Sequence, residues 1–409
     1  LPLTANGKLD RKALPAPDAS ALRSREYVAP QGALETTLAQ IWAEVLNVER
    51  VGRHDHFFEL GGHSLLAVVL IERMRHVRLS ADVRVLFSQP TLAALAGAIG
   101  SGREIEVPAN LIAPGCQSIS PQLLPLLTLD QPSIDRVVAS VPGGVGNVQD
   151  IYPLAPSQEG VLYHHITAQQ GDPYLLNAQL AFDSIERLQA FAQALQTVID
   201  RHDILRTAVL WQGFSQPLQV VRRAAVLPLQ QIILDPRDGD VLGQLHARFD
   251  ARHYRLDLAQ APLIQLMYAP DPRNARVVAV LLFHHIVMDH TALDVLRAEI
   301  HASLRGHGEP LDAPMPYRNY VAQARLGVGE AEHEAFFREM LGDVDEPTLP
   351  FGLQRVHGDI EEATQTLPKA LSVRLRSQAR VLGVSAASLF HLAWARLLGA
   401  ASGNDTVVF

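Results

Sequence analysis

The chain has 409 residues, which is long enough for two or three domains, each with its own core. Its apolar fraction of 48% and charged fraction of 19% are typical of a globular protein, and its net charge of -8 argues against a general nucleic-acid binder. The longest apolar runs, residues 65–71 and 277–283, are too short to span a bilayer, so no membrane partner is expected.

The single cysteine, Cys116, cannot form an internal disulfide, which fits a reducing cytosol. It lies in a polar, proline-containing stretch, and we do not expect it to be a catalytic thiol. The chain starts at Leu1 without an initiator methionine or a signal-like apolar segment. We therefore expect it to be part of a longer cytoplasmic protein.

Residues 1–29 carry one glycine and several prolines without periodicity, which is typical of a tail and linker. Apolar positions then recur with a helical period over residues 34–46. After a loop with two adjacent glycines, a second helix is predicted over residues 64–76 and a third over residues 91–99. Residues 30–102 are therefore predicted to form a small all-α bundle of three or four helices.

Residues 103–119 are predicted to be an interdomain linker, because the surrounding stretch is rich in glycine, proline and serine. Strands and helices then alternate through residues 120–350, which indicates a layered α/β or α+β domain. The continuously apolar run at 277–283 suits a strand buried on both faces. The expected strands are residues 179–182, 207–211, 218–221, 263–268 and 277–283, and the expected helices are residues 133–140, 186–202 and 291–304.

Residues 351–409 are expected to begin a second lobe. Helices are predicted over residues 372–382 and 386–400. Residues 405–409 start like a strand whose partners are missing from the sequence, so we expect this lobe to be incomplete.

Ser64 follows two glycines at the start of an apolar helix, where the helix N-terminus favours a phosphate. Taken alone, such a serine is most often an N-cap. The whole run of residues 55–65, DHFFELGGHSL, resembles the attachment motif of peptidyl carrier proteins. The resemblance implies that a phosphopantetheinyl transferase attaches 4'-phosphopantetheine to Ser64, and that the thiol of this arm holds amino acids as thioesters.

Residues 6–11, NGKLDR, resemble the closing motif of adenylation domains. Lys8 matches the active-site lysine of that family, but nearly all of such a domain is absent from the sequence. We therefore expect Lys8 to be inert here, and an adenylation domain to be the upstream partner of the carrier protein.

A second motif, HHIVMDH at residues 284–290, places two imidazoles and a carboxylate just beyond the predicted buried strand. Such a cluster is often a set of buried, hydrogen-bonded side chains, but it can also perform acid–base chemistry. It resembles the HHxxxDG motif of condensation domains of nonribosomal peptide synthetases, which have the chloramphenicol acetyltransferase fold with two lobes. Residues 152–160 (YPLAPSQEG), 201–207 (RHDILRT) and, loosely, 317–320 (YRNY) resemble further motifs of that family.

The resemblance implies that His285 is the active-site histidine, with His284 beside it. It also implies an ion pair between Asp289 and Arg201, with Arg206 as further support of the site. The acceptor would be an aminoacyl thioester on a downstream carrier protein, whose α-amine attacks the donor thioester. Because an α-amine has a pKa of about 7.7 to 8.0, His285 need only orient the amine or the intermediate, and proton removal is a second possibility.

Residues 164–172, HHITAQQGD, lie on the expected first helix of that domain and just after it. A bare pair such as His164-His165 is most often solvated or satisfied in a core. The spacing through Gly171 and Asp172, however, resembles the HH[I/L]xxxxGD pattern of dual epimerization/condensation domains. This resemblance implies that the donor residue is inverted at Cα before it is joined.

His290 stands where the HHxxxDG motif ends in glycine. Histidine adopts a positive φ less cheaply than glycine, so either the loop geometry or the lining of the site is expected to differ. The DH ending, and the stretch at 134–152 with its VPGG turn, also resemble the dual subfamily. Epimerization removes and returns a proton at Cα, which a histidine can do. We expect His285 to be the nearer base and residues 164–172 to shape the site, although the sequence leaves this assignment open.

The sequence therefore predicts a peptidyl carrier protein followed by a dual epimerization/condensation domain, from a bacterial nonribosomal peptide synthetase that makes an antibiotic or lipopeptide. The downstream modules of the same synthetase would be its partners, and no metal or nucleic acid is expected. Three alternatives stay open. They are a condensation-only domain that takes a D-configured donor, a stand-alone epimerization domain, which normally keeps glycine at position 290, and a non-catalytic domain that docks partners.

Overall fold

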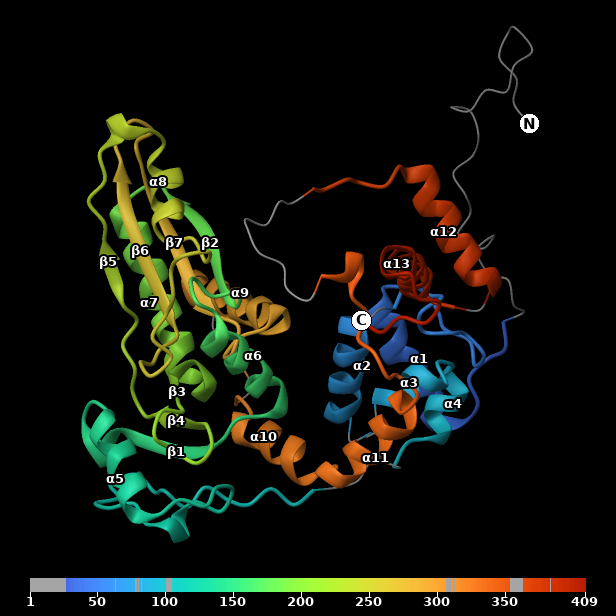
Figure 1. Ribbon diagram of the computed structural model, residues 1–409, viewed down its shortest axis with the longest axis horizontal. Coiled ribbons are helices and arrows are strands. Elements are labelled where there is room, and N and C mark those ends of the chain that lie inside the picture. The colour runs from blue at the N-terminus through green and yellow to red at the C-terminus, as the bar shows by residue number, and fades with distance from the viewer. Residues whose placement is uncertain are drawn as a thin grey trace, which may run out of the picture. The chain divides into compact units, whose positions relative to one another are not determined.

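The computed structural model describes residues 27–62, 64–77, 79, 81, 83–100, 105–306, 311, 313–353, 363–382 and 384–409. The chain forms two compact units (Figure 1). The first unit contains the residues up to Arg103 and those from Phe337 onward, and the second unit runs from Glu104 to Phe336. Lys8 lies outside the described residues. No helix in the described part of the chain is long and apolar enough to cross a membrane.

The N-terminal part of the first unit is a helical bundle, as predicted. Its core contains Trp42 and Phe57, which are fully buried and pack edge to face with ring centroids 5.1 Å apart. Thr91 begins the last helix as its N-cap and accepts the backbone N–H of Ala94. The helices are α1 (Gly32–Leu46), α2 (Ser64–His76), α3 (Val83–Ser88) and α4 (Leu92–Gly97).

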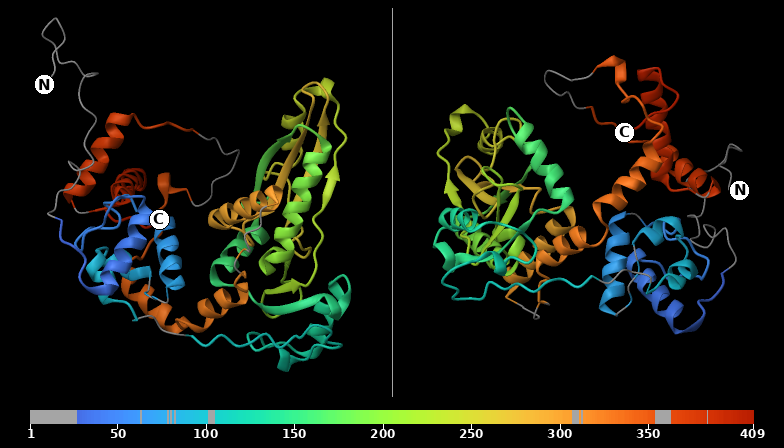
Figure 2. Two further views of the ribbon diagram at one scale, coloured as in Figure 1. Left: turned by 180° about the vertical axis from the view of Figure 1, so that it is seen from behind. Right: turned by 60° about the horizontal axis from the view of Figure 1, so that its bottom comes forward.

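The second unit contains two sheets with helices packed against them (Figure 2). The helices are α5 (Gln131–Ser140), α6 (Pro156–Thr167), α7 (Ile185–Arg201), α8 (Val241–Arg248), α9 (His290–Arg305) and α10 (Tyr317–Leu326). The strands are β1 (Val148–Pro153), β2 (Leu175–Phe182), β3 (Thr207–Leu210), β4 (Leu218–Arg222), β5 (Leu229–Gln231), β6 (Ile264–Asp271) and β7 (Arg276–His284). The predicted elements are confirmed within a few residues at their ends, while β1, β5, α8 and α10 were not predicted.

One sheet has the strand order β1-β4-β3 and is antiparallel. The other has the order β2-β7-β6-β5, in which only the β5–β6 pair is parallel. Strand β7 is central and has a core on each face, because successive side chains of a strand point to opposite sides. The face toward α7 and α9 carries Ala279, Leu281 and Phe283, and the face toward α8 carries Val278, Val280 and Leu282. The prediction of a strand buried on both faces is confirmed.

The end of β7 positions the histidine motif. The strand stops at His284, and α9 starts at His290 after a short loop. Asp289 is the N-cap of α9, and its Oδ1 accepts the N–H of Ala292 at 2.7 Å. The loop is therefore held at one end by the sheet and at the other by a capped helix.

The stretch that was predicted to be a linker packs onto the second unit. Ile112 and Ile119 are buried in one cluster with Ile134 of α5 and Ile151 of β1. Residues 105–119 contain no helix or strand, but these two side chains anchor the stretch by burying apolar surface.

The C-terminal part of the first unit contains the end of α11 (Glu330–Leu341), then α12 (Lys369–Leu382) and α13 (Ala386–Ser402). The two helices predicted there are confirmed. The strand predicted at residues 405–409 is wrong: these residues have no regular structure, and the N–H of Val408 donates to Thr348 Oγ1 at 2.9 Å. The valines favour a strand, but an isolated strand is not stable without partners, and none pairs with it among the described residues.

Candidate active site

The Ser64 site is built by the backbone of the loop before α2. Ser64 is the first residue of that helix. Gly61 has a φ of +104°, which residues with a Cβ rarely adopt. A Cβ on Gly62 would lie 2.4 Å from the ring of the buried Phe57. The loop therefore requires both glycines, and it places Ser64 at a helix N-terminus. A phosphate attached to this serine fits the position, because the helix N–H groups and dipole favour an anion.

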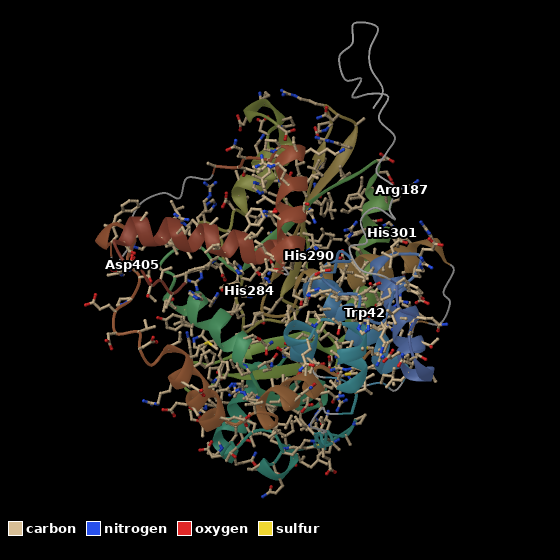
Figure 3. The ribbon with its side chains drawn as sticks, turned by 90° about the vertical axis from the view of Figure 1, so that its right-hand side faces the viewer. Trp42, Arg187, His284, His290, His301 and Asp405 are labelled. Carbon is tan, nitrogen blue, oxygen red and sulfur yellow. The ribbon has the colours of Figure 1, made fainter. Side chains whose placement is uncertain are left out.

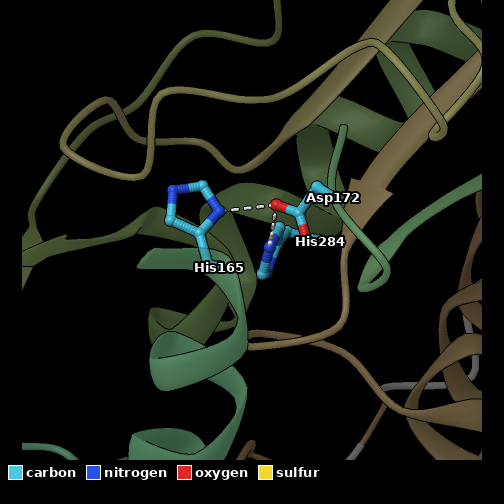
Figure 4. A group of neighbouring side chains, drawn as sticks. All are labelled: His165, Asp172 and His284. Atoms are coloured by element: carbon cyan, nitrogen blue, oxygen red, sulfur yellow. Dashed lines mark hydrogen bonds and ion pairs between the residues drawn. The ribbon is translucent and has the colours of Figure 1, made fainter. Parts of the chain in front are cut away.

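The buried centre of the second unit consists of His165, Asp172 and His284 (Figure 4). Asp172 Oδ2 lies 2.6 Å from His165 Nδ1 and 3.0 Å from His284 Nε2. The other carboxylate oxygen accepts the N–H of Tyr174 at 3.0 Å. The 164–172 stretch and the 284–290 motif, which are more than 100 residues apart in sequence, therefore meet at one carboxylate oxygen.

Gly171 allows the carboxylate to reach this position. Its φ is +67°, and a Cβ there would lie 2.4 Å from the carbonyl oxygens of Ala251 and Arg252. The next residue, Asp172, donates its N–H to Ala251 at 2.7 Å. The Arg255 guanidinium also binds the end of α6, because it donates to the carbonyl oxygens of His165 and Ala168. A close backbone contact and an arginine thus fix the stretch that carries the cluster.

The tautomer of His284 follows from its partners. The N–H of Ile286 donates to Nδ1 at 3.1 Å, so the proton of the neutral ring is on Nε2, which donates to Asp172. Burial lowers the pKa of His284, against the opposing effect of Asp172. Burial also acts to raise the pKa of Asp172, but the hydrogen bonds from His165, His284 and the Tyr174 N–H outweigh it and hold that pKa below its ordinary value. The cluster therefore pairs an ionised carboxylate with a neutral His284.

The same three side chains have ligand atoms within 4.8 Å of one another, a spacing that could suit a metal ion. The hydrogen bonds argue for another arrangement. A metal on His284 Nε2 would require the ring proton on Nδ1, where it would face the N–H donor of Ile286. We therefore interpret the cluster as a hydrogen-bonded group and not as a metal site.

His285 lies just past the end of β7 and, unlike His284, has an exposed side chain. Its N–H donates to the carbonyl oxygen of Tyr174 at 2.9 Å. Its ring stands edge-on to the Tyr174 ring, with centroids 6.0 Å apart and the planes at 75°. His164 is also exposed, and its ring contacts the same tyrosine ring at 5.8 Å. An accessible imidazole beside a rigid buried cluster is suited to orient a substrate or to transfer a proton.

Gln158 holds the loop that carries His285, and it was not among the predicted site residues. Gln158 is buried; its Nε2 donates to the Ile286 carbonyl oxygen at 2.9 Å, and its Oε1 accepts the N–H of Ala155 at 2.9 Å. Its Nε2 also donates to Gln219 Oε1 at 3.0 Å. The residue lies in the 152–160 motif, but a glutamine in the first turn of a helix is equally typical of a capping residue.

The structure differs from the predicted ion pair between Arg201 and Asp289. Arg201 Nε lies 3.2 Å from Oε1 of Glu299 on α9, and His202 Nε2 lies 2.9 Å from the other oxygen. The Asp289 carboxylate is used as the cap of α9 instead. The physical reason is its position: a residue at the N-cap turns its oxygen toward its own helix, whereas Glu299 is buried where α9 packs on α7.

Among the contacts of the described residues, Arg206 and His290 are bonded to other partners than the buried cluster. Arg206 is buried and donates to Gln149 Oε1 at 2.8 Å and to the carbonyl oxygen of Ile199 at 3.2 Å, so it joins the end of α7 to β1. His290 is exposed and opens α9, with Nε2 3.9 Å from Asp294 (Figure 3). It does not have a positive φ. The helix start accepts histidine here, and no glycine is required.

Comparisons with known proteins agree with this architecture. Residues 36–99 match the family described as phosphopantetheine attachment site, and residues 148–409 match the condensation domain family. Malpinin synthetase and malpibaldin synthetase of Mortierella alpina are 52% and 50% identical over 411 and 413 residues, covering 100% of this chain but only 5% and 7% of those proteins. These two relatives are fungal, so the predicted bacterial source is not supported.

A solved four-domain nonribosomal peptide synthetase, bound to AMP and glycine, also resembles the chain. Its TM-score is 0.51 at 14% identity, over 63% of this chain and 20% of that one. An identity this low supports the fold alone. Together with the two matched families, it confirms the predicted fold class of a helical carrier domain followed by a condensation domain.

Proposed function

The chain belongs to the condensation domain family, with a phosphopantetheine attachment domain ahead of it, and from this we propose that it works inside a longer nonribosomal peptide synthetase. In this proposal, the donor is a thioester on the Ser64 arm, and the acceptor is an aminoacyl thioester on a downstream carrier protein. An adenylation domain loads the donor, and a phosphopantetheinyl transferase attaches the arm. The product is a new peptide bond.

The 4'-phosphopantetheine arm would supply the thiol that holds the donor as a thioester. The chain's own residues do the rest. The exposed imidazole of His285 orients the acceptor amine toward the donor carbonyl and can accept the proton that this amine loses on attack. Two neighbours fix the backbone that carries this imidazole: Gln158 Nε2 donates to the Ile286 carbonyl oxygen, and the Tyr174 carbonyl oxygen accepts the His285 N–H.

We also propose that the domain inverts the donor at Cα before it joins it. One observation supports this proposal: Asp172 binds His165 and His284 through the same oxygen. The stretch that resembles dual epimerization/condensation domains is therefore part of the same buried cluster as the main histidine motif.

His285 is the base in this proposal. His284 is buried, and both of its ring nitrogens are engaged, by Asp172 and by the Ile286 N–H. Taking a proton at Nδ1 would break the second of these bonds. The His285 ring is exposed, and no described residue is hydrogen-bonded to its nitrogens. The thioester acidifies the Cα–H from which this ring would take a proton.

The test is deuterium exchange in the synthetase that contains this chain. An L-aminoacyl group is loaded on the Ser64 arm in heavy water, and mass spectrometry follows the label at Cα. We expect label to enter, and His285→Ala to abolish both label and dipeptide. Dipeptide formation from a D-loaded donor without any exchange would leave a condensation-only domain. Absence of both reactions would leave a docking domain.

A further inference from the structure

Besides Asp172, Tyr174 also connects the two histidine motifs. Its N–H donates to Asp172 Oδ1 at 3.0 Å, and its carbonyl oxygen accepts the N–H of His285 at 2.9 Å. Its ring contacts the rings of His164 and His285, with centroids 5.8 Å and 6.0 Å away. It directly precedes β2, whose first residue pairs with His284. Both its backbone and its side chain therefore have a fixed relation to the site.

The side chain of Tyr174 is on the accessible side of the site. It is half-buried, and the two histidines that its ring contacts are exposed, whereas His165, Asp172 and His284 are buried. Within the described part of the chain, its hydroxyl has no hydrogen-bond partner, in contrast to the hydroxyl of Tyr320, which lies 3.4 Å from Ser157 Oγ. A phenol beside His285 is thus available to a substrate.

We propose that Tyr174 is a second catalytic residue of the epimerization, the acid that returns a proton to Cα on the face opposite to His285. This inference rests on the proposed epimerization. A phenol O–H can donate a proton, and the free ring nitrogen of a neutral imidazole can accept one. The two side chains therefore suit opposite halves of the reaction.

The proton and electron balance is simple. His285 takes the proton from Cα: the C–H bond breaks, an N–H bond forms, and the electron pair moves into the thioester as an enolate. The Tyr174 O–H bond then breaks as the enolate electron pair forms a new C–H bond on the other face. The phenolate takes a proton from the solvent, and His285 releases its proton to the solvent. Nothing is oxidised or reduced.

The experiment compares exchange with inversion in Tyr174→Phe, in the synthetase that contains this chain. The variant keeps the ring and both backbone hydrogen bonds, and it loses only the hydroxyl. We expect His285 still to exchange the Cα proton with heavy water from one face, while the product keeps its L configuration. The ratio of inversion to exchange should fall by at least about 100-fold, the contribution typical of a general acid.

Tyr163→Phe is the matched control, because Tyr163 is exposed, belongs to the neighbouring helix α6 and contacts His164 but not His285. It should keep the parent ratio. An unchanged ratio in Tyr174→Phe would overturn the proposal, and so would equal loss of exchange and inversion, which would make Tyr174 a positioning residue only. If the parent synthetase shows neither exchange nor inversion, the proposed epimerization fails, and this inference fails with it.

Discussion

Replacing Gly171 by alanine should disrupt the site through the backbone alone. The added Cβ would lie 2.4 Å from two carbonyl oxygens, those of Ala251 and Arg252. The alanine would also have to adopt a φ of +67°. Backbone atoms cannot move aside as a flexible side chain can. The alanine should therefore displace the turn, and with it the carboxylate of Asp172 that follows.

The cost has two parts. A residue with a Cβ in the left-handed region lowers the free energy of unfolding by about 1–2 kcal/mol. An overpacked contact typically lowers it by about a further 1–3 kcal/mol. Gly306→Ala is the matched control, because Gly306 has a φ of +65° and nothing within 4 Å of its ideal Cβ. Gly306→Ala should therefore be destabilised only by the positive φ and not by a clash. The difference between the two variants, about 1–3 kcal/mol, then measures the clash.

The stability of the second unit can be measured by urea unfolding, with hydrogen exchange in peptides from β7 as the probe. With a slope of roughly 2 kcal/mol per M, the midpoint of Gly171→Ala should lie about 0.5–1.5 M below that of Gly306→Ala. Donor inversion should fall in the first variant only. Equal midpoints, or full inversion in Gly171→Ala, would refute the argument that the close contact at Gly171 positions Asp172.

Three further predictions concern single side chains. Gln158→Glu replaces a donor by a carboxylate beside a backbone carbonyl, so the kcat of condensation should fall by roughly 100-fold with little change in KM. Because burial lowers the pKa of His284, the unfolded chain binds a proton there that the folded chain does not; urea midpoints should fall as the pH drops below about 6.5. His284→Gln should flatten this slope, and a variant of the exposed His301 should keep it. Arg255→Met should lower the stability of the second unit by about 1–3 kcal/mol, whereas Arg252→Met, at the surface, should change it little.

Local patterns were sufficient where one segment determines its own structure. The apolar run that became β7, the amphipathic α7 and the Gly-Gly loop before Ser64 all follow from period, length and turn residues. The residues of the two histidine motifs were also found from sequence, because each motif is a short run. These features require no knowledge of distant contacts.

Long-range partners could not be found in this way. The hydrogen bond between Asp172 and His284 joins residues 112 positions apart, and spacing along the chain says nothing about it. Arg201 was assigned the wrong acceptor for the same reason, because only the packing of α7 on α9 shows that Glu299 is the nearer carboxylate. Tyr174 gave no sequence signal at all, since its role depends on two rings that the fold brings to it.

The stereochemistry of the dipeptide tests the central claim most directly. The synthetase that contains this chain is loaded with an L-aminoacyl group on the Ser64 arm, supplied with a downstream aminoacyl carrier protein, and its product is resolved by chiral chromatography. We predict that the donor residue of the dipeptide is D-configured, and that Asp172→Asn, which weakens the link between His165 and His284, yields less of the D form. A donor residue that remains entirely L in the parent dipeptide would contradict the account.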